Sequence, residues 1–297
     1  MANLKEIRTR ISSVKSTRQI TSAMKMVSAA KLRRAQDIIL QMRPYANKLQ
    51  EIQDDLCKSL SDSVDIPLRE QREVKKAVFI IISSNKGLCG AFNGNVAKEV
   101  IQTIENSDKY KKLLEEEKLE LVCIGKKAGD ILKSKKYPPT ESLNEIYDDL
   151  QYATVAFIGE RLIDRFLSKE IDEVVLFYNQ FKNAAVQILM KEQLLPVISI
   201  EDMEEEKSAI HNDYILEPSN EAIITEIMPK LVKTNLYSAI LDSNASEHGA
   251  RMTAMHQATD NATELIKVLQ LDYNKARQAS ITNEILEIVG GAEALNG

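Results

Sequence analysis

The feature of this sequence that most limits its possible folds is a heptad pattern in the last quarter of the chain, residues 219–297. Alternating steps of three and four residues from Ile224 to Asn283 meet eighteen positions: nine large apolar or aromatic, three Ala and six polar. A spacing sustained over this length predicts one long helix with a coiled-coil seam. As a helix the stretch would be on the order of 100 Å long. A compact domain needs no such helix, so we expect something outside the chain to surround part of it.

The first part of the chain, residues 3–60, carries a second heptad frame, which starts at Leu4. It predicts another long helix, with a local kink at Pro44 and an interruption of the frame at Gln53. Between Arg18 and Ser28 the frame positions are mostly polar. Two interpretations of that section stay open: a polar face in contact with solvent, or a section contacted by other subunits.

Two heptad helices at opposite ends of one chain are natural partners if they run antiparallel and the residues between them are inserted at one end of the pair. We therefore expect an antiparallel two-helix coiled coil that carries an α/β (Rossmann-like) globular domain. The expected sections are 1–60 for the N-terminal helix, 75–200 for the α/β head and 219–297 for the C-terminal helix. Whether Pro229 kinks the last helix or marks its start stays open.

The insertion alternates apolar runs with amphipathic stretches. Residues 77–82 form a continuous apolar run, which is typical of a strand buried on both faces. Further strands are expected at 119–124, 173–178 and 185–189, and helices at about 95–106, after Gly125, and at about 150–168. This order predicts a mixed, partly parallel sheet with helices packed against it.

A glycine-rich loop follows the first expected strand and contains Gly87, Gly90 and Gly94. A Rossmann fold holds a pyrophosphate at such a loop. The spacing here is not G-x-G-x-x-G, however, and the chain contains no G-x-x-x-x-G-K-[ST] segment. We expect glycines that serve a tight turn and close backbone packing, and we expect no cofactor.

The remaining chemistry-bearing residues form no recognisable site. The cysteines, Cys57, Cys89 and Cys123, are widely spaced. The histidines are His211, His248 and His256, and neither His248 nor His256 has a plausible acid or Cys partner at ligand spacing. The pattern predicts reduced thiols and neither a metal site nor a catalytic set. No apolar run reaches roughly 18 residues, so no membrane span is expected, and the N-terminus lacks the apolar core of a signal peptide.

Charge is distributed unevenly along the chain. Residues 1–50 contain eleven Lys and Arg against two acids, a charge of +9 within a chain of net charge −5. A basic arm can face nucleic acid, acidic lipid or an acidic protein surface. A nucleic-acid-binding module is one alternative function, although aromatic residues do not alternate with the basic ones. A Rossmann-type enzyme is another, suggested by the middle section.

Both ends of the chain resemble one family. The run L-K-E-I-R-T-R-I-S-S-V-K-S-T-R-Q-I-T-S-A-M-K-M-V-S-A-A-K is similar to the opening of the gamma subunits of F-type ATP synthases. The segment I-T-N-E-I-L-E-I-V-G-G-A-E-A, residues 281–294, resembles the C-terminal signature of that family. The segments S-E-H-G-A-R-M-T-A-M and S-S-N-K-G-L-C-G-A-F-N also resemble it, so the resemblance covers essentially the whole chain.

The resemblance implies a non-catalytic rotor shaft in an ion-transporting ATP synthase. The coiled coil would turn inside a ring of alpha and beta subunits, which hold the nucleotide sites, and the head would rest on the epsilon subunit and the membrane c-ring. Proton or sodium flow would drive rotation and so ATP synthesis, and the subunit would take part in regulating ATPase activity. It would lie peripherally on the cytoplasmic face of the bacterial inner membrane, with no nucleic-acid partner.

The resemblance also implies residues that contact the beta subunits. Met24 matches a methionine near the beta subunits. Lys25, the next residue, is assigned to the same contact. Arg277 and Gln278, in K-A-R-Q-A, match a polar pair that engages a beta-subunit loop, and Thr282 matches the threonine of the signature. Chloroplast-type relatives carry an inserted dithiol, whereas residues 201–216 contain no Cys here, so we expect no response to thiol reduction.

Overall fold

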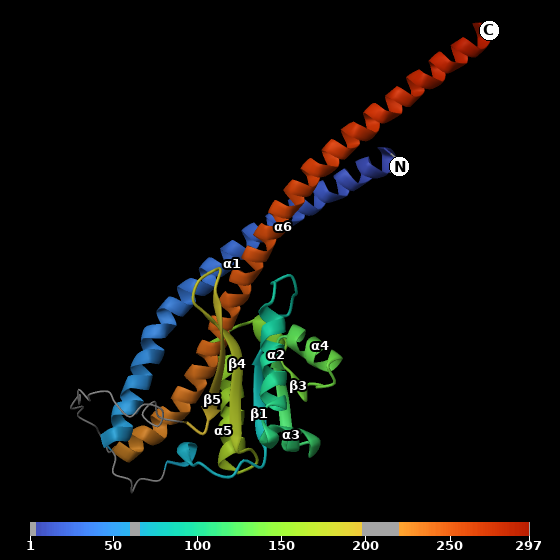
Figure 1. Cartoon of the computed structure of the whole chain (residues 1–297). Helices are drawn as coiled ribbons and strands as arrows, with labels where there is room; N and C mark the ends of the chain where they lie inside the picture. Colours follow the sequence, from blue (N-terminus) through green and yellow to red (C-terminus); the bar gives the residue numbers. More distant parts are fainter. Residues whose placement is uncertain (1–3, 60–65, 198–219, 297) are drawn as a thin grey trace. The chain divides into compact units, whose positions relative to one another are not determined.

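The structure is a computed structural model that describes residues 4–59, 66–197 and 220–296. Its elements form two compact units. The first, which we call the helix-pair unit, contains residues up to 29 and from 251 onward; the second, the α/β unit, contains residues 30–250. Two long helices, α1 (Leu4–Ser59) and α6 (Asn220–Asn296), contribute to both (Figure 1).

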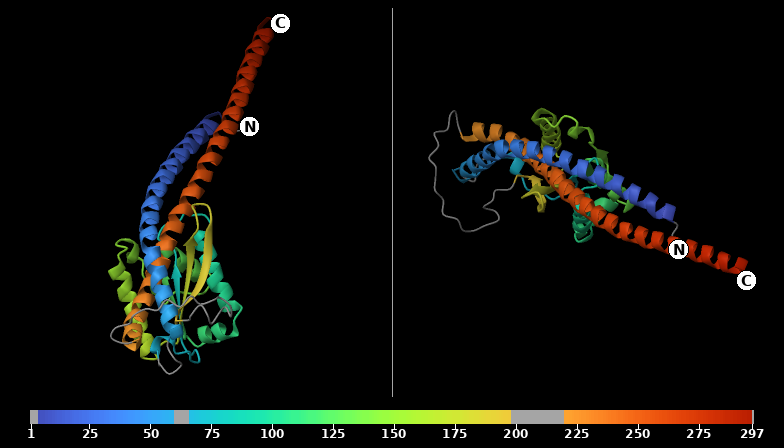
Figure 2. Two further views of the ribbon diagram at one scale, coloured as in Figure 1. Left: turned by 90° about the vertical axis from the view of Figure 1, so that its left-hand side faces the viewer. Right: turned by 90° about the horizontal axis from the view of Figure 1, so that it is seen from above.

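The helix-pair unit consists of α1 and α6 running side by side in opposite directions (Figure 2). The predicted heptad positions form the contact. All the predicted positions from Met252 to Ser280 are buried or half-buried, and Asn283 is exposed. The prediction is wrong at Asn283 because α6 there has passed the end of its partner. The buried residues at the contact are Ile7, Thr21, Ser28, Met255, Ala262, Ile266 and Leu269.

The polar section of the first heptad frame keeps its place in this contact. Thr21 and Ser28 are buried, and Arg18 and Lys25 are half-buried. The section is therefore packed within the chain rather than being a purely solvent-facing surface. Farther along α1, Gln53 is buried as well, so the interruption expected there is wrong: the Gln53 amide accepts a hydrogen bond from Gln50 at 2.7 Å and stays in the frame.

A five-stranded sheet forms the centre of the α/β unit, in the order β3-β2-β1-β4-β5. β1 pairs in parallel with β2 and β4, β2 pairs in parallel with β3, and β5 pairs antiparallel with β4. The predicted mixed, partly parallel sheet is confirmed. The strands are β1 (Ala77–Ile82), β2 (Leu119–Ile124), β3 (Glu141–Ser142), β4 (Glu173–Phe181) and β5 (Gln187–Leu195).

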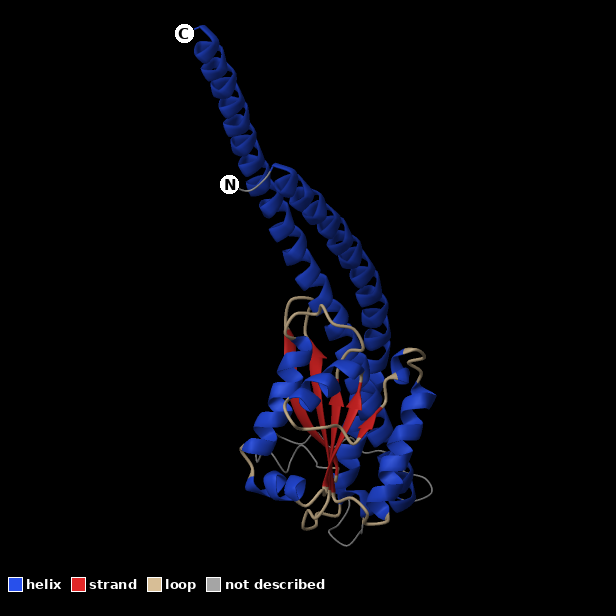
Figure 3. Cartoon of the chain, turned by 90° about the vertical axis from the view of Figure 1, so that its right-hand side faces the viewer, coloured by secondary structure: helices blue, strands red, loops and turns tan. Residues whose placement is uncertain are grey.

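Helices cover both faces of the sheet (Figure 3). One face packs against α2 (Phe92–Glu105), α3 (Asp108–Glu115) and α4 (Lys126–Ser134), and the other against α5 (Tyr152–Leu167) and α6. Side chains of β1 alternate between the two cores: Phe79 and Ile81 belong to the first, Ile80 and Ile82 to the second. This alternation is the period of two that a strand buried on both faces requires. Two 3-10 turns, Pro67–Arg69 and Glu145–Tyr147, complete the unit.

Within the α/β unit, α6 is a core helix. Leu231, Leu236 and Ile240 are fully buried and join the core that α5 and the sheet share. Pro229 lies inside α6, which begins at Asn220, so it does not mark the start of the helix. Helix α1 likewise continues through Pro44.

Candidate partner-contact surface

A polar layer joins the two helices of the helix-pair unit. The Thr259 hydroxyl lies 2.8 Å from the Thr21 hydroxyl and 2.7 Å from the Met255 carbonyl, and the Thr21 hydroxyl lies 3.1 Å from the Arg18 carbonyl one turn back on α1. Thr263 donates to the Thr259 carbonyl at 2.8 Å. Small hydroxyl side chains let the helices approach closely while their polar atoms stay paired. The pair is therefore slim at this level.

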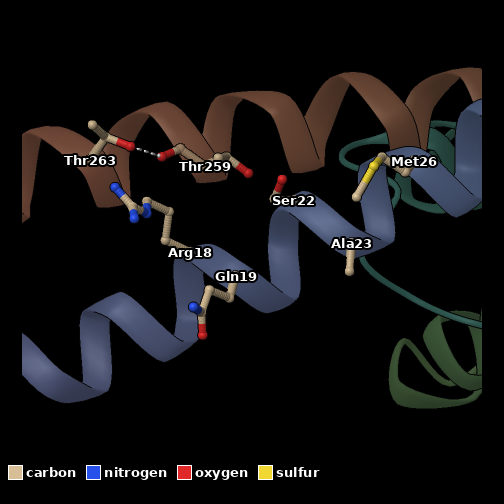
Figure 4. A pocket seen from close by; sticks show the side chains of 7 residues that line it. All are labelled: Arg18, Gln19, Ser22, Ala23, Met26, Thr259 and Thr263. Atoms are coloured by element: carbon tan, nitrogen blue, oxygen red, sulfur yellow. Dashed lines mark hydrogen bonds between the residues drawn. The ribbon is translucent and has the colours of Figure 1, made fainter.

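Beside this layer the two helices leave an open groove of about 430 Å³ (Figure 4). Its lining comes from one face of α1 and two threonines of α6: Arg18, Gln19, Ser22, Ala23, Met26, Thr259 and Thr263. The Arg18 side chain points from α1 toward α6 across the opening (Figure 4). A groove with a guanidinium, an amide and hydroxyl groups suits a polar or acidic side chain of a partner.

Large apolar side chains of α1 are exposed in and beside the groove. Ile20, Met26 and Val27 are all more than half exposed, Met26 at 66%. Sequence reasoning missed these three residues because it followed only the heptad frame. Their signal was present: they are large apolar residues at positions that the frame assigns to solvent, which is typical of a surface covered by another protein.

The candidate contact residues fall into two places. Met24 and Lys25 are half-buried on the part of α1 that pairs with α6. Arg277, Gln278 and Thr282 are exposed on α6, and Thr282 donates to the Gln278 carbonyl at 2.9 Å. The structure therefore brings Arg277, Gln278 and Thr282 together on one helix. It does not bring them to Met24 and Lys25, whose level on α6 lies about 30 Å away along the helix axis.

The end of α6 extends beyond α1. Because Thr21 pairs with Thr259 in an antiparallel arrangement, Leu4 at the start of α1 lies level with about residue 276. Residues 277–296 thus continue as a single helix for about 30 Å, as the two helix ends in Figure 1 show.

Large apolar side chains are exposed on this single-helix segment. Ile281, Ile285, Leu286, Ile288 and Val289 are between 47% and 72% exposed. Consecutive residues of a helix are about 100° apart, so Ile281, Ile285, Ile288 and Val289 share one face of α6, and Leu286 lies at the edge of that face. Within the described residues nothing covers them. An exposed apolar face of this kind is typical of a surface that another protein covers.

The glycine-rich loop gives no sign of a phosphate cradle. Gly90 has φ +60, as the expected tight turn requires. A side chain added at Gly87, Gly90 or Gly94 would meet no atom within 4 Å, so the expected close backbone packing at these glycines is wrong. The loop's polar groups bond to one another: the Asn93 side chain accepts from the Ser84 amide at 3.0 Å, and Ser84 donates to the Lys86 carbonyl at 2.7 Å.

Close packing occurs instead at Gly125, the residue between β2 and α4. Its φ is +94, and a Cβ there would overlap the Ser83 carbonyl. The Ser83 hydroxyl accepts from the Ala128 amide at 3.1 Å and so holds the start of α4 against the end of β1. This glycine fixes the fold rather than a ligand.

Other candidate chemistry is structural where the structure describes it. Cys89 and Cys123 are buried free thiols, and burial raises the pKa of Cys123 to about 12. His256 Nδ1 lies 3.2 Å from Asp260 Oδ2 on the exposed side of α6, so the expectation that His256 has no acid partner is wrong. His211 lies outside the described residues. In residues 4–59, 66–197 and 220–296 no group of His, Cys, Asp and Glu side chains is arranged to hold a metal ion. None of the helices there combines the length and apolar content of a membrane span.

Comparison with known proteins gives matches over the full length. A family model described as ATP synthase matches residues 3–295. The ATP synthase gamma chains of Christiangramia forsetii and Flavobacterium johnsoniae are each 56% identical over 297 residues, which is 100% of both chains.

Two solved structures are similar. A chain of the Tetrahymena thermophila mitochondrial ATP synthase central stalk/c-ring has 25% identity and a TM-score of 0.57, over 80% of this chain and 99% of that one. A chain of the Euglena gracilis mitochondrial ATP synthase rotor has 22% identity and a TM-score of 0.64, over 94% and 98%, and shows the same fold.

Proposed function

The chain belongs to the ATP synthase gamma chain family, and we propose on this basis how it works as the central-stalk rotor subunit. It turns inside a ring of alpha and beta subunits and couples ion flow through the membrane sector to ATP synthesis at the beta-subunit sites. Through the same contacts it takes part in regulating ATPase activity. The chain is not itself catalytic.

The observation that carries this proposal is the single-helix end of α6. Ile281, Ile285, Ile288 and Val289 are exposed along one face of it, with Leu286 at the edge of that face. A helix binds an apolar surface of a partner through such a face. The exposed apolar face therefore fits contact with the surrounding alpha and beta subunits.

Section by section, we propose that residues 1–60 and 219–297 form the shaft and residues 75–200 the head. The head stands on the epsilon subunit and the c-ring. The complex is membrane-associated, and this chain is a peripheral member of it that lies on the cytoplasmic face of the bacterial inner membrane. Its side chains supply contacts and torque.

The contact residues are part of the proposal. Arg277 forms charge-assisted hydrogen bonds to a beta-subunit carboxylate, with Gln278 and Thr282 one turn apart on the same exposed face. Met24 and Lys25 contact the beta subunits from α1, next to the apolar surface of Ile20, Met26 and Val27. The basic residues of α1 attract acidic surfaces of the partner subunits by long-range electrostatics and do not require a permanent apolar contact with one of them.

Inverted membrane vesicles test the function directly. Membranes carrying the complete complex are stripped of this chain together with the alpha and beta subunits, and the complex is rebuilt with or without the chain. With the chain, addition of ATP is expected to drive ion uptake, with protons and sodium followed separately, and an imposed ion gradient is expected to drive ATP synthesis. ATP-driven uptake that is equal with and without the chain would contradict the function.

A further inference from the structure

In the α/β unit, one arginine connects three elements. Arg43 of α1 donates through Nη2 to Asp242 Oδ1 of α6 and to the carbonyl of Phe181 at the end of β4, both at 3.0 Å. The guanidinium group is planar and has several donors in a fixed arrangement, so it can hold two acceptors in one orientation. This contact therefore fixes both the distance of α1 from its neighbours and its rotation about its own axis.

The contact lies next to the weakest point of α1. Pro44 follows Arg43 and has no backbone donor, so the Leu40 carbonyl loses its regular helical hydrogen bond. Helices bend most easily at such positions. The nearby packing of α1 comes from apolar side chains such as Ile39 and Leu49, whose contacts have little directional preference. Arg43 thus supplies a directional contact where the backbone is least rigid.

The surroundings of the contact favour a fixed cation. The Asp242 side chain is only 8% exposed, whereas that of Arg43 is 42% exposed. Tyr178 of β4, on which the charges of Asp242 and Arg43 act, donates to Glu192 Oε1 of β5 at 3.0 Å. The cluster thus combines one guanidinium with two carboxylates and a phenol from four elements.

The electrostatics point the same way. Burial raises the pKa of Asp242, and the Arg43 guanidinium opposes that rise. Burial also raises the pKa of Glu192, and the charge of Asp242 adds to the effect while the Tyr178 hydrogen bond opposes it. Without Arg43, two partly buried carboxylates would be left close together with no cation between them.

We propose that Arg43 is a positioning residue for torque transfer: it clamps α1 to α6 and to the sheet, so that α1 turns with the head instead of slipping against it. The proposal rests on the rotor function above. It assigns a role in coupling to a residue that touches neither a nucleotide nor, by this contact, a partner subunit. Loss of the clamp leaves the shaft in place and makes the transmission of rotation less efficient.

The test measures coupling in the complete complex carrying Arg43→Ala. The readout is ion uptake per ATP hydrolysed in inverted vesicles, with hydrolysis recorded on the same sample. We expect hydrolysis to persist while the coupling ratio falls roughly two- to thirtyfold, the range for residues that transmit coupling without touching a ligand. Arg43→Lys keeps the charge but replaces the rigid planar guanidinium by a compact ammonium whose donors rotate, and it is expected to recover part of the ratio.

The matched control is Arg161→Ala. Arg161 has a similar exposed fraction, 41%, and pairs with Glu141 at 2.8 Å, but this ion pair joins α5 to β3 and does not involve the long helices. We expect its coupling ratio to equal that of the wild type. An equal loss in both variants would mean that any ion pair of the head has this effect, and would overturn the proposal.

A second variant addresses the case in which Arg43→Ala fails to fold. Arg43→Met combined with Asp242→Leu removes both charges and leaves no orphaned carboxylate at this contact. We expect this double variant to assemble and hydrolyse ATP and still to couple poorly. A normal coupling ratio would overturn the clamp. If the wild-type chain itself does not support ion uptake, the rotor function fails instead, so the two failures are distinguishable.

Discussion

The hydroxyl of Thr259 of α6 donates a hydrogen bond of 2.8 Å to the hydroxyl of Thr21 of α1, within the contact between the two helices. A typical coiled coil would bury Leu or Ile at these positions. A hydrogen-bonded pair of small side chains fixes the register of the helices while it keeps them thin. For a shaft that has to turn inside a ring, this is a useful compromise between specificity and diameter.

The first prediction concerns the coupling between these two threonines. Thr21→Val, Thr259→Val and the double variant form a mutant cycle, in which the coupling term isolates the hydrogen bond. We expect a coupling free energy of about 0.5–1.5 kcal/mol, the net value of a typical intramolecular hydrogen bond. Hydrogen exchange of the amides of residues 7–28 in the full chain measures it. Strictly additive effects would show that the two hydroxyls do not depend on each other.

A second prediction is the pH dependence of stability at Asp172. Burial disfavours this carboxylate, but the Lys75 amide, the Arg72 guanidinium and the Lys76 amide outweigh that effect and hold its pKa below the usual range. A lowered folded-state pKa stabilises the protein above the unfolded-state pKa, and this contribution is lost as pH falls through the folded-state pKa.

Asp172→Asn should therefore lower the free energy of unfolding by about 1.5–3 kcal/mol at pH 7, since hydrogen bonds to a charged group are lost. The deficit should shrink as the pH falls below about 3.9, where the carboxyl begins to protonate in the unfolded chain. Urea unfolding of the full chain at several pH values measures it. Asp130→Asn, on the exposed side of α4, is the control and should change stability little. A deficit that is constant from pH 7 to pH 3 would contradict the account.

The third prediction addresses the proposed polar contact on α6. Arg277→Ala combined with Gln278→Ala should reduce coupled ATP synthesis severalfold, because a beta-subunit carboxylate loses its charged partner. The two side chains are exposed in the chain, so its own stability should be unchanged. Lys267→Ala, also exposed on α6, is the matched control. Unchanged synthesis in the double variant would rule out the contact.

Thiol chemistry supplies the fourth prediction. Cys89 and Cys123 are buried, and burial raises the pKa of Cys123 to about 12, so that little reactive thiolate exists near neutral pH. Dithiothreitol should leave ATP synthesis and hydrolysis unchanged. An activation of several-fold by the reductant would show that a disulfide regulates the chain after all.

Elements with one dominant pattern were predictable from the sequence. The strands at residues 77–82 and 119–124 are found at the expected residues. Each is an apolar run because helices pack against both faces of the sheet there. The heptad frames placed both long helices for the same reason. A repeated apolar spacing leaves few alternatives.

Elements whose ends depend on tertiary contacts were not predictable to the same degree. β5 runs from Gln187 to Leu195 rather than over 185–189. The prediction missed its second half because an edge strand tolerates polar residues such as Lys191 and Glu192, which obscure the alternation of apolar and polar residues. Helix α3 was missed: it has eight residues and only Tyr110 and Leu113 are buried. Pro229 lies within α6 because its neighbours Met228 and Leu231 are held in the core.

Some residues of the candidate site were predictable from the sequence, and others were found only in the structure. Met24, Lys25, Arg277, Gln278 and Thr282 came from motif resemblance, and their contacts stay predictions. The exposed apolar residues around Ile288 and Met26 follow from physical reasoning only once the structure shows which side of each helix is covered. The clamp of Arg43 joins residues about 200 positions apart in the sequence, so no local sequence pattern predicts it.

The central claim is that this chain rotates, and the measurement that tests it most directly observes rotation. The chain is assembled with alpha and beta subunits that are fixed to a surface, and a bead is attached through Lys112→Cys on the exposed side of α3, with Cys57 replaced by Ser. The account predicts that ATP makes the bead turn in one direction and that rotation stops when ATP is exhausted. ATP hydrolysis by complexes that contain the chain while the bead stays fixed would contradict it.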